Sequence, residues 1–351
     1  MNIILQKQYC CDIMSLSANP ETRRTVMKTF IKQPGKDFKI LNLTDTQLSN
    51  DEWADTHKHR AILEYTVKEL VERVKPDLIT ISGDLSWAGH DHAYDMLADF
   101  IDGFGIPWAP VWGNHDNQNG AEYIDGVATR YMTYPNCIYE KGNPALGNGN
   151  YVISIEENGA PVEAVVMLDT HDRTPITNAD GETKLAWAKL LPEQAEWIGE
   201  ELNALKARGC KDATLIMHIP IYAYRLATSA AYKSGIDLKS ITPEMAEGVE
   251  CWNEGYTDSI GVQYEGIGSF PEDDGMLEAF KKMEIIKHLV AGHEHVNNFM
   301  INYEGIKMIY ALKIGAGCYW NPILNGGTVL TVNENGVCKA HHEYVNVEHL
   351  L

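Results

Sequence analysis

The most constraining stretch of the chain runs from Leu78 to Ser82 and is followed by Gly83 and Asp84. Its apolar and β-branched residues, bounded by Pro76 and a glycine, predict a buried strand. Asp84 then stands at the carboxyl end of that strand, which is the end where ligands bind in open α/β sheets. A lone Gly-Asp pair is also typical of an ordinary turn, and the neighbouring strands have to decide between the two interpretations.

A second strand of the same kind precedes this one. The apolar run 38–43 leads into Asp45-Thr46-Gln47, and another aspartate therefore follows a strand. Between the two runs, apolar residues recur at helical spacing from 63 to 74, and Pro76 predicts the end of that helix. A strand, a helix and a strand in this order imply parallel strands, which would place Asp45 and Asp84 at one edge of a sheet.

Three more predicted strands end in polar residues. The run 106–112 leads into Gly113-Asn114-His115-Asp116, the strand 213–217 ends at His218, and the strand 285–291 ends in Gly292-His293-Glu294-His295. Carboxylate, amide and imidazole donors at one sheet edge predict a metal site, and this mixture suits Mn, Fe or Zn better than calcium, which prefers oxygen alone. Asp84 is central in the set, and its two carboxylate oxygens make it the natural bridge between two cations.

Each motif has a simpler explanation when it is taken alone. His293 and His295 could be exposed loop residues, Asn114 a turn former and His218 a satisfied core histidine. These simpler explanations do not account for the fact that each of the motifs follows the end of a predicted strand and that they occur in this order. Gly89-His90-Asp91-His92 repeats the Gly-His-x-His spelling, but no strand leads into it, so we expect a pocket-rim or solvated role there. The same exposed role is expected for two histidines before the first helix, His57 and His59.

Charge and cysteine content limit the possible partners. The net charge of −20, from 49 acidic and 29 basic residues, argues against a nucleic-acid surface or an anionic membrane as a partner. An anionic substrate would need a local positive charge, which divalent cations could supply. Seven cysteines without a Cys-x-x-Cys pair favour a reduced compartment. We expect a cytoplasmic protein with no signal peptide and, since no apolar run reaches about 18 residues, no membrane span.

Most of the chain is expected to form one domain. Residues 1–35 lack a clear pattern and are interpreted as an N-terminal extension, with the domain over 36–351. Loops at 117–150, 170–184 and 219–275 leave or follow the ligand-bearing strand ends and are expected to form the pocket. The best candidates for substrate contact there are Tyr222, Tyr224 and Arg225, because a guanidinium can meet a phosphate with two hydrogen bonds. Arg225 could equally be a solvated loop residue. The segment after His295 is expected to form antiparallel strands that complete a second sheet.

The motifs together resemble the calcineurin-like metallophosphoesterase superfamily, over residues 38–320. The family pattern of Asp-x-His, Gly-Asp, Gly-Asn-His-Asp/Glu, a later His and Gly-His-x-His is matched by Asp45-Thr46-Gln47, Gly83-Asp84, Gly113-Asn114-His115-Asp116, His218 and Gly292-His293-Glu294-His295. Within the superfamily, the chain is most similar to single-domain purple acid phosphatase-like proteins. The resemblance implies an α/β (α+β) fold of two facing mixed sheets flanked by helices, in four layers.

By the same resemblance, the site would hold two divalent transition-metal ions. The expected ligands of one ion are Asp45, Gln47, Asp84 and His295, and those of the other are Asp84, Asn114, His218 and His293. His115, oriented by Asp116, would protonate the leaving group. The chain departs from the family at two positions: Gln47 replaces the usual histidine, and Trp87 replaces the iron-binding tyrosine of purple acid phosphatases, which removes the phenolate ligand.

The expected activity is the hydrolysis of a phosphate ester, with the two metal ions activating a bridging water or hydroxide for attack on phosphorus. A phosphomonoesterase is the first expectation. A phosphodiesterase acting on nucleotides or phospholipid headgroups is the second, and a non-catalytic scaffold of the same fold is the third.

Overall fold

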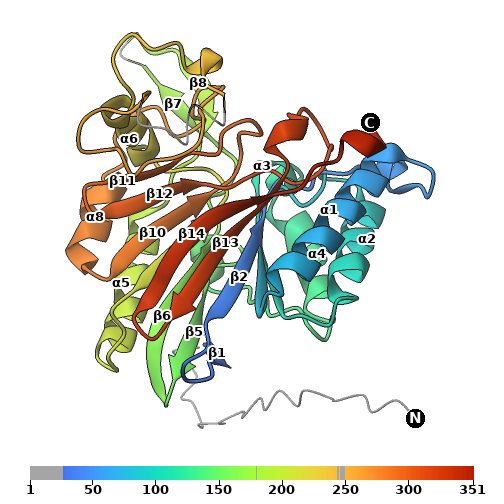
Figure 1. The fold of residues 1–351 in the computed structure, drawn as a ribbon, viewed down its shortest axis with the longest axis horizontal. Coiled ribbons are helices and arrows are strands. Elements are labelled where there is room, and N and C mark those ends of the chain that lie inside the picture. The colour runs from blue at the N-terminus through green and yellow to red at the C-terminus, as the bar shows by residue number, and fades with distance from the viewer. Residues whose placement is uncertain (1–26, 179, 243–244, 246–249) are drawn as a thin grey trace.

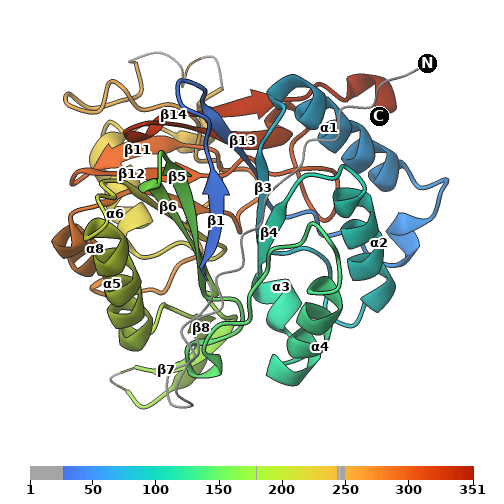
Figure 2. The same cartoon turned by 90° about the horizontal axis from the view of Figure 1, so that it is seen from below.

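Two β-sheets face each other in the centre of the molecule, and helices cover the outer face of each sheet (Figures 1 and 2). The computed structural model describes residues 27–351 except 179, 243–244 and 246–249. The four layers run helix, sheet, sheet, helix, as the resemblance implied. Among the described residues, no helix combines the length and the apolar character that a membrane crossing requires.

The first sheet has five strands in the order β14-β13-β2-β3-β4. Strands β2 (Phe38–Leu43), β3 (Leu78–Ser82) and β4 (Trp108–Val111) pair parallel, with β4 at the edge. Strand β13 (Gly326–Asn333) pairs antiparallel with β2 and with β14 (Gly336–Tyr344), which forms the other edge. Helices α1 (Lys58–Val74), α2 (Asp91–Asp102) and α4 (Ala121–Tyr131) lie on its outer side (Figure 2). The parallel pairing of β2 and β3 brings their carboxyl ends to one edge, as the predicted strand-helix-strand unit requires.

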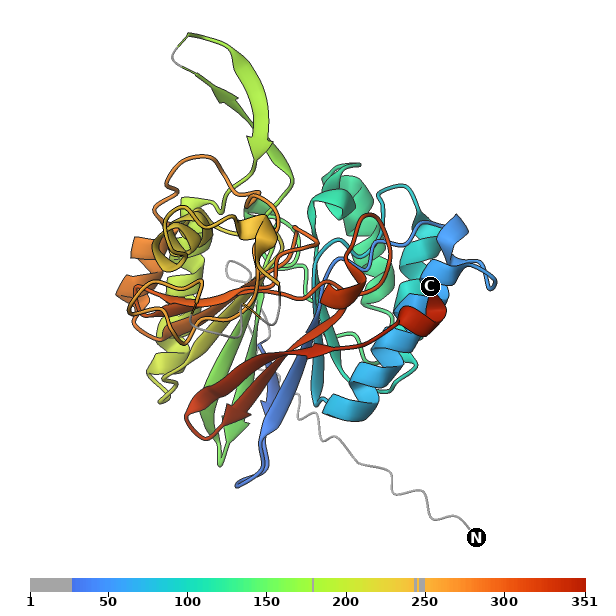
Figure 3. The same cartoon turned by 45° about the horizontal axis from the view of Figure 1, so that its top comes forward.

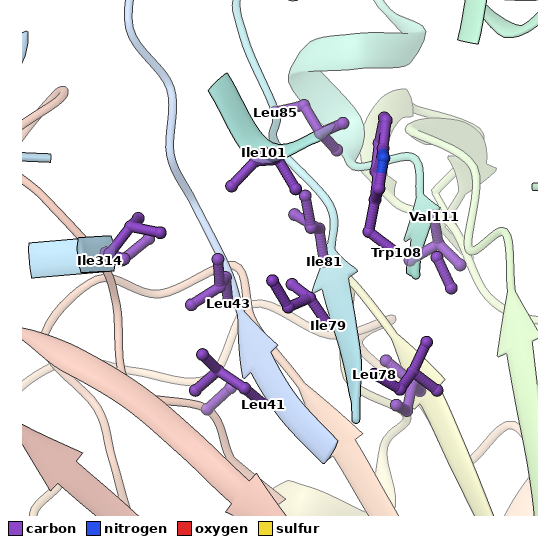
Figure 4. Close-up of a cluster of buried hydrophobic side chains, with 14 of the residues drawn as sticks. Leu41, Leu43, Leu78, Ile79, Ile81, Leu85, Ile101, Trp108, Val111 and Ile314 are labelled. Atoms are coloured by element: carbon purple, nitrogen blue, oxygen red, sulfur yellow. The ribbon is translucent and has the colours of Figure 1, made fainter. Parts of the chain in front are cut away.

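The core of this half is made by strands that are buried on both faces. Every residue of β3 and β4 is buried, as is typical of parallel strands covered on two sides. Figure 4 shows Leu41 and Leu43 of β2 in one cluster with Ile79 and Ile81 of β3 and with Ile101 of α2. The strands that carry the two aspartates are therefore held in a rigid, fully packed layer.

The second sheet has seven strands in the order β1-β5-β6-β9-β10-β12-β11. The strands are β1 (Lys28–Ile31), β5 (Tyr151–Glu157), β6 (Ala160–Leu168), β9 (Ala213–Met217), β10 (Ile286–Ala291), β11 (Met300–Tyr303) and β12 (Ile306–Tyr310). Helices α5 (Pro192–Lys206), α6 (Ala223–Ala231) and α8 (Met276–Met283) lie on its outer side (Figure 2). Alternate residues of β6 serve the two faces: Val165 and Met167 join the core that includes the first sheet, whereas Val166 and Leu168 join the core under these helices.

Four sequence-based expectations about the fold need correction. Strand β1 lies within the expected extension and pairs parallel with β5, so residues 28–31 belong to the sheet; residues 1–26 lie outside the described part.

The loop expected over 117–150 contains helix α4. The loop expected over 170–184 is mostly a hairpin of β7 (Arg173–Thr177) and β8 (Thr183–Trp187), which projects from the body of the protein (Figure 3). Finally, the strands after His295 divide between both sheets, since only β13 and β14 join the five-stranded one.

Candidate metal centre

Asp84 is held at the centre of the site by its backbone and by three neighbours. It follows β3 directly and adopts a left-handed backbone with φ 50°. Its Oδ1 accepts a hydrogen bond from the His115 amide (2.8 Å), and its Oδ2 lies 2.6 Å from Gln47 Nε2 and 3.2 Å from His218 Nε2. The preceding Gly83 is required by space, because a Cβ there would come within 2.5 Å of the His218 ring. Residues that follow four strands, β2, β3, β4 and β9, thereby meet at one carboxylate.

Two groups of buried donor atoms converge here, and both contain Asp84. One group is Asp45, Asp84 and His295, and the other is Asp84, His218 and His293; within each group the ligand atoms lie within 4.8 Å of one another. Asn114 joins the second group, because its Oδ1 is 3.1 Å from His218 Nε2. The predicted residues from five strand ends are thus brought together, with Asp84 shared between the two groups.

The residues that carry these donors adopt backbone conformations that are uncommon for residues other than glycine. Besides Asp84, φ is positive at Asp45 (57°), Gln47 (36°) and His293 (91°). The loops that follow β2 and β3 are also bonded to each other: the Asp45 amide donates to the Gly83 carbonyl and the Gln47 amide to the Asp84 carbonyl, both at 3.1 Å. Strained backbone of this kind persists only where the surrounding structure fixes it, and it gathers at functional sites.

Unsatisfied polar atoms at the site fit bound metal ions. Gln47 Oε1 and both ring nitrogens of His293 are buried and have no hydrogen-bond partner among the described residues. Buried polar atoms without partners are costly and rare, and each one calls for an explanation. An amide oxygen, carboxylates and imidazoles form a donor set that suits a divalent transition metal. The donor residues of the site therefore fit the predicted pair of divalent metal ions.

The charges of the site support the same interpretation. Burial by itself would raise the pKa of Asp45, but His295, His218 and Lys313 reverse this and hold that pKa below its ordinary value. Burial likewise opposes protonation of His218, yet Asp84 and Asp45 raise its pKa to about 10. At His293, burial and the neighbouring His218 lower the pKa to about 3. The two buried carboxylates therefore need a compensating positive charge. The lowered pKa keeps His293 a neutral imidazole, which is the form that binds metals.

Outer hydrogen bonds orient the donors. His218 Nδ1 bonds to the Ser82 carbonyl (2.9 Å) and His295 Nδ1 to the Tyr319 carbonyl (2.8 Å), so both rings turn Nε2 toward the carboxylates. Beneath Asp45 lies the fully buried Lys313, whose Nζ donates to the Asp45 carbonyl oxygen. Burial lowers the pKa of Lys313 to about 8 against the opposing effect of Asp45.

A cavity of about 290 Å³ opens onto both donor groups. Five of its lining residues are site residues that were predicted from the sequence: Asp84, Asn114, His115, His293 and His295. The remaining wall is formed by Trp187, Glu265, Gly266, Glu294, Cys318 and Tyr319. Glu265 and Gly266 lie in the segment 219–275, which was expected to form the pocket, and Glu294 lies inside a motif. Trp187, at the end of the β7–β8 hairpin, and Cys318 and Tyr319, in a later loop, were not predicted.

Comparison with known proteins agrees with this site. A family model described as calcineurin-like phosphoesterase matches residues 38–297. The chain belongs to this family. The two donor groups, whose residues run from Asp45 to His295, lie within the matched residues and are the candidate metal site of this metallophosphoesterase.

The relatives of this metallophosphoesterase are distant. The protein named probable inactive purple acid phosphatase 28 of Arabidopsis thaliana is 24% identical over 73% of this chain and 62% of the relative. Phosphatase DCR2 of Saccharomyces cerevisiae is 28% identical over 86% of this chain and 52% of the relative. The chain thus spans about half to three fifths of the length of these two proteins. The crystal structure of a dimetal phosphatase from Danio rerio superposes with a TM-score of 0.53, at 12% identity, over 87% of this chain and 98% of that one, which shows a shared fold.

The metallophosphoesterase differs from expectation at the residue next to the expected proton donor. Asp116 does not contact His115; it is fully buried and accepts hydrogen bonds from the Tyr94 hydroxyl (2.7 Å) and the Gly113 amide (2.7 Å). Burial, followed by the charge of Asp84, raises the pKa of Asp116 to about 7. Its role is to hold the loop after β3 against the start of the short helix α3 (Asn114–Asn117).

His115 is instead oriented by residues that sequence reasoning did not select. Its Nδ1 lies 2.7 Å from the Gln118 side-chain nitrogen, and its ring packs edge to face with Trp87 at 4.2 Å between ring centroids. The Trp87 ring therefore supports the histidine beside the site. The signal was present in the sequence, since Gln118 stands one helical turn after His115.

The three predicted substrate contacts are placed elsewhere. Tyr224 is fully buried, and its hydroxyl donates to the carbonyls of Leu289 (2.9 Å) and Ile309 (3.2 Å), which makes it a core residue. Arg225 is held by Ser269, at 2.6 Å from its hydroxyl. Neither of these two residues nor Tyr222 is among the residues that line the cavity. The reason is that 223–231 form helix α6, which packs against the sheet where a loop was expected.

The additional histidines lie away from the donor groups, but three of them, His57, His59 and His90, are half-buried and hydrogen-bonded where a pocket-rim or solvated position was expected. His90 is at the N-cap position of α2, and its Nδ1 accepts from the Asn50 amide (3.2 Å). His59 pairs with Glu52 at 2.7 Å, and His57 caps helix α1. None of these three, nor the exposed His92, belongs to either donor group or to the cavity wall.

Proposed function

We propose that this protein is a phosphomonoesterase that works with two divalent transition-metal ions, Mn, Fe or Zn. The observation that carries the proposal is the pair of buried donor groups that share Asp84 at the floor of a small cavity, with His115 in its wall. When bound, two cations would neutralise the charge of a phosphate ester and lower the pKa of a water molecule. A cavity of about 290 Å³ suits one small ester.

The chain's own residues would divide the remaining work. Asp45, Gln47, Asp84 and His295 would hold one ion, and Asp84, Asn114, His218 and His293 the other. Because an amide nitrogen only donates, the Gln118 contact makes His115 Nδ1 an acceptor and leaves the proton on Nε2. His115 Nε2–H can then donate a hydrogen bond to the oxygen of the leaving group and stabilise the negative charge that develops on it. Trp87 holds the ring in place for this contact.

Two other functions are kept as alternatives. Hydrolysis of phosphodiesters, of nucleotides or phospholipid headgroups, needs the same centre with room for a second ester group, and the open side of the cavity toward the exposed Tyr319 supports it. A non-catalytic scaffold is supported by the word "inactive" in the names of three relatives, whereas a fourth is named a phosphatase.

The proposal is tested on purified protein loaded with Mn, Fe or Zn. Elemental analysis should find two ions per chain, and turnover of nitrophenyl phosphate should exceed that of bis-nitrophenyl phosphate. Faster turnover of the diester would select the second function. Two bound ions without hydrolysis of either ester would select the scaffold, and only trace metal would refute the dimetal site itself.

A further inference from the structure

The wall of the cavity beyond the metal donors is made of carboxylates and aromatic rings. Among the described lining residues there is no lysine and no arginine, whereas Glu265, Glu294, Trp187 and Tyr319 all face the cavity. The phosphate charge would be met by the metal centre, and the leaving group would lie against this wall. The half-buried carboxylate of Glu265 would repel a second anionic group there and attract a cation.

Tyr319 and Glu265 form one corner of this wall, directly beside a metal donor. The Tyr319 ring stacks on His295 at 4.2 Å between centroids with 17° between the planes, and the residue is 47% exposed, so its opposite side is open. Its hydroxyl donates to Glu265 Oε1 at 2.8 Å, and the His295 amide lies 3.1 Å from the same oxygen. A single hydrogen bond therefore joins an aromatic residue with an open face to a carboxylate.

Glu265 is a fixed residue and not a mobile surface side chain. Its backbone amide donates to Asn297 Oδ1 (3.1 Å), and its carbonyl accepts from Asn297 Nδ2 (3.2 Å). Asn297 is 1% exposed and stands two residues after His295. The carboxylate is thus placed by the same loop that places the metal donor, which is the arrangement expected of a built subsite.

Trp187 on the other wall is less available to a substrate. It packs edge to face with His293 at 4.3 Å, and the guanidinium of Arg173 lies 3.9 Å from its ring centroid. The Trp187 ring therefore already has a cationic partner, the Arg173 guanidinium, within the protein. The open face that remains is that of Tyr319.

From these contacts we infer that the preferred substrate is a phosphate monoester of an amino alcohol, whose ammonium group lies on the Tyr319 ring beside Glu265. Quaternary and primary ammonium groups are attracted to aromatic faces, and a nearby carboxylate adds to that attraction. The inference rests on the proposed phosphomonoesterase function and names the substrate class of that same site.

The decisive comparison uses two esters that differ by one charge. Phosphocholine and 3,3-dimethylbutyl phosphate have the same shape, but a carbon replaces the quaternary nitrogen in the second. We expect kcat/KM of the metal-loaded protein to favour phosphocholine by about tenfold or more. Glu265→Gln and Tyr319→Leu should both bring this ratio toward one, while Tyr319→Phe, which keeps the ring, should retain most of it. The exposed Glu334 offers a matched control, and Glu334→Gln should leave the ratio unchanged.

Failure of the inference is distinguishable from failure of the proposed function. Equal turnover of the two esters would overturn the ammonium subsite and leave the phosphomonoesterase in place. If no ester is hydrolysed, the proposed function fails, and calorimetry with choline against 3,3-dimethylbutan-1-ol decides the subsite. Choline binding that is lost in Glu265→Gln would support it, and equal or absent binding of the two alcohols would overturn it.

Discussion

Each of the two sheets carries buried acidic residues, with opposite results. At the carboxyl ends of β2 and β3 in the five-stranded sheet, Asp45 and Asp84 meet histidines and Lys313, and the pKa of each carboxyl is held below its ordinary value although burial opposes this. Near the start of β6 in the seven-stranded sheet, Glu163 is fully buried, and neither carboxylate oxygen has a hydrogen-bond partner among the described residues. Burial, followed by the charge of Asp212, raises the pKa of Glu163 well above its ordinary value.

The difference shows what turns buried carboxyls into a site for cations. His288 also lies near the second cluster, with its Nδ1 3.5 Å from Asp212 Oδ1. Yet in the part of the chain that the structure describes, compact groups of three donors occur only at the carboxyl ends. Loops that follow strands can turn several side chains toward one point, whereas side chains within strands are held apart by the ladder. A metal centre therefore needs several donor side chains that point toward one place, and the burial of carboxyl groups alone does not produce it.

The largest effect should come from breaking that convergence at Asp84. Asp84→Asn keeps the shape but removes the charge shared by both groups, and metal content should fall at both positions. Turnover of every ester should fall by about 10³-fold or more, because the metal centre supplies several kcal/mol and each ~1.4 kcal/mol is a factor of ten. Elemental analysis and kinetics on the same sample measure this, and a variant that retains both ions would remove Asp84 from the bridging position.

The next effect concerns the side chain that shares the cavity without belonging to either donor group. His115→Ala should leave the metal content intact and lower kcat by roughly 10²- to 10⁴-fold on esters with poor leaving groups. The loss should shrink on a nitrophenyl ester, whose leaving group scarcely needs a proton. Gln118→Ala should follow the same dependence on the leaving group with a smaller loss. An equal loss on good and poor leaving groups would show that His115 only positions the substrate.

A smaller effect is expected at the position where the chain departs from its family. Gln47 offers a neutral amide oxygen, so the group with Asp45 and His295 should release its ion first during titration with a chelator. Gln47→His should tighten that position by about 10- to 100-fold, the range seen for changes around metal ligands. The measurement is stepwise metal loss in wild type and variant. Simultaneous loss of both ions from the wild type would contradict the ranking.

The smallest effect is expected away from the centre, at Glu163. Its pKa is raised by folding, so the folded protein keeps a proton that the unfolded chain releases above pH ~4.5, and stability falls as pH rises through this window. Glu163→Gln carries no such proton, so its stability relative to wild type should increase from pH 5 to pH 8. Urea unfolding at both pH values measures this, with Glu334→Gln as the control. The same slope in wild type and Glu163→Gln would mean that the carboxyl is not protonated in the fold.

The sequence was most informative where one residue's position follows from the strand before it. Asp45, Asp84, His218 and His293 each follow an apolar run, and parallel pairing then dictates that they meet. Strand β1 was missed because its four residues alternate in burial at a sheet edge and form no apolar run. The β7–β8 hairpin was missed because most of its residues are exposed, which leaves little apolar periodicity to detect.

Residues that reach the site across the fold could not be predicted in the same way. Lys313 and Tyr319 lie in a loop that approaches Asp45 and His295 only in three dimensions, and neither belongs to a spacing pattern. Asp116 shows the opposite error: it is adjacent to His115 in sequence, but the short helix α3 turns its side chain into the interior. Whether a side chain reaches the site therefore depends on the direction in which the backbone turns it, and this cannot be read from the neighbouring residues in the sequence.

The projecting hairpin of β7 and β8 also has a consequence for how such a protein can change over evolutionary time. Its strands pair only with each other, most of its side chains are exposed, and it reaches the metal centre through Trp187 at its base (Figure 3). Substitutions, insertions or the exchange of the whole hairpin would cost the fold little stability. Selection could therefore alter the wall of the cavity while the residues that hold the ions stay the same. The hairpin is in this sense a replaceable part, and substrate preference could diverge between close homologues faster than the chemistry they share.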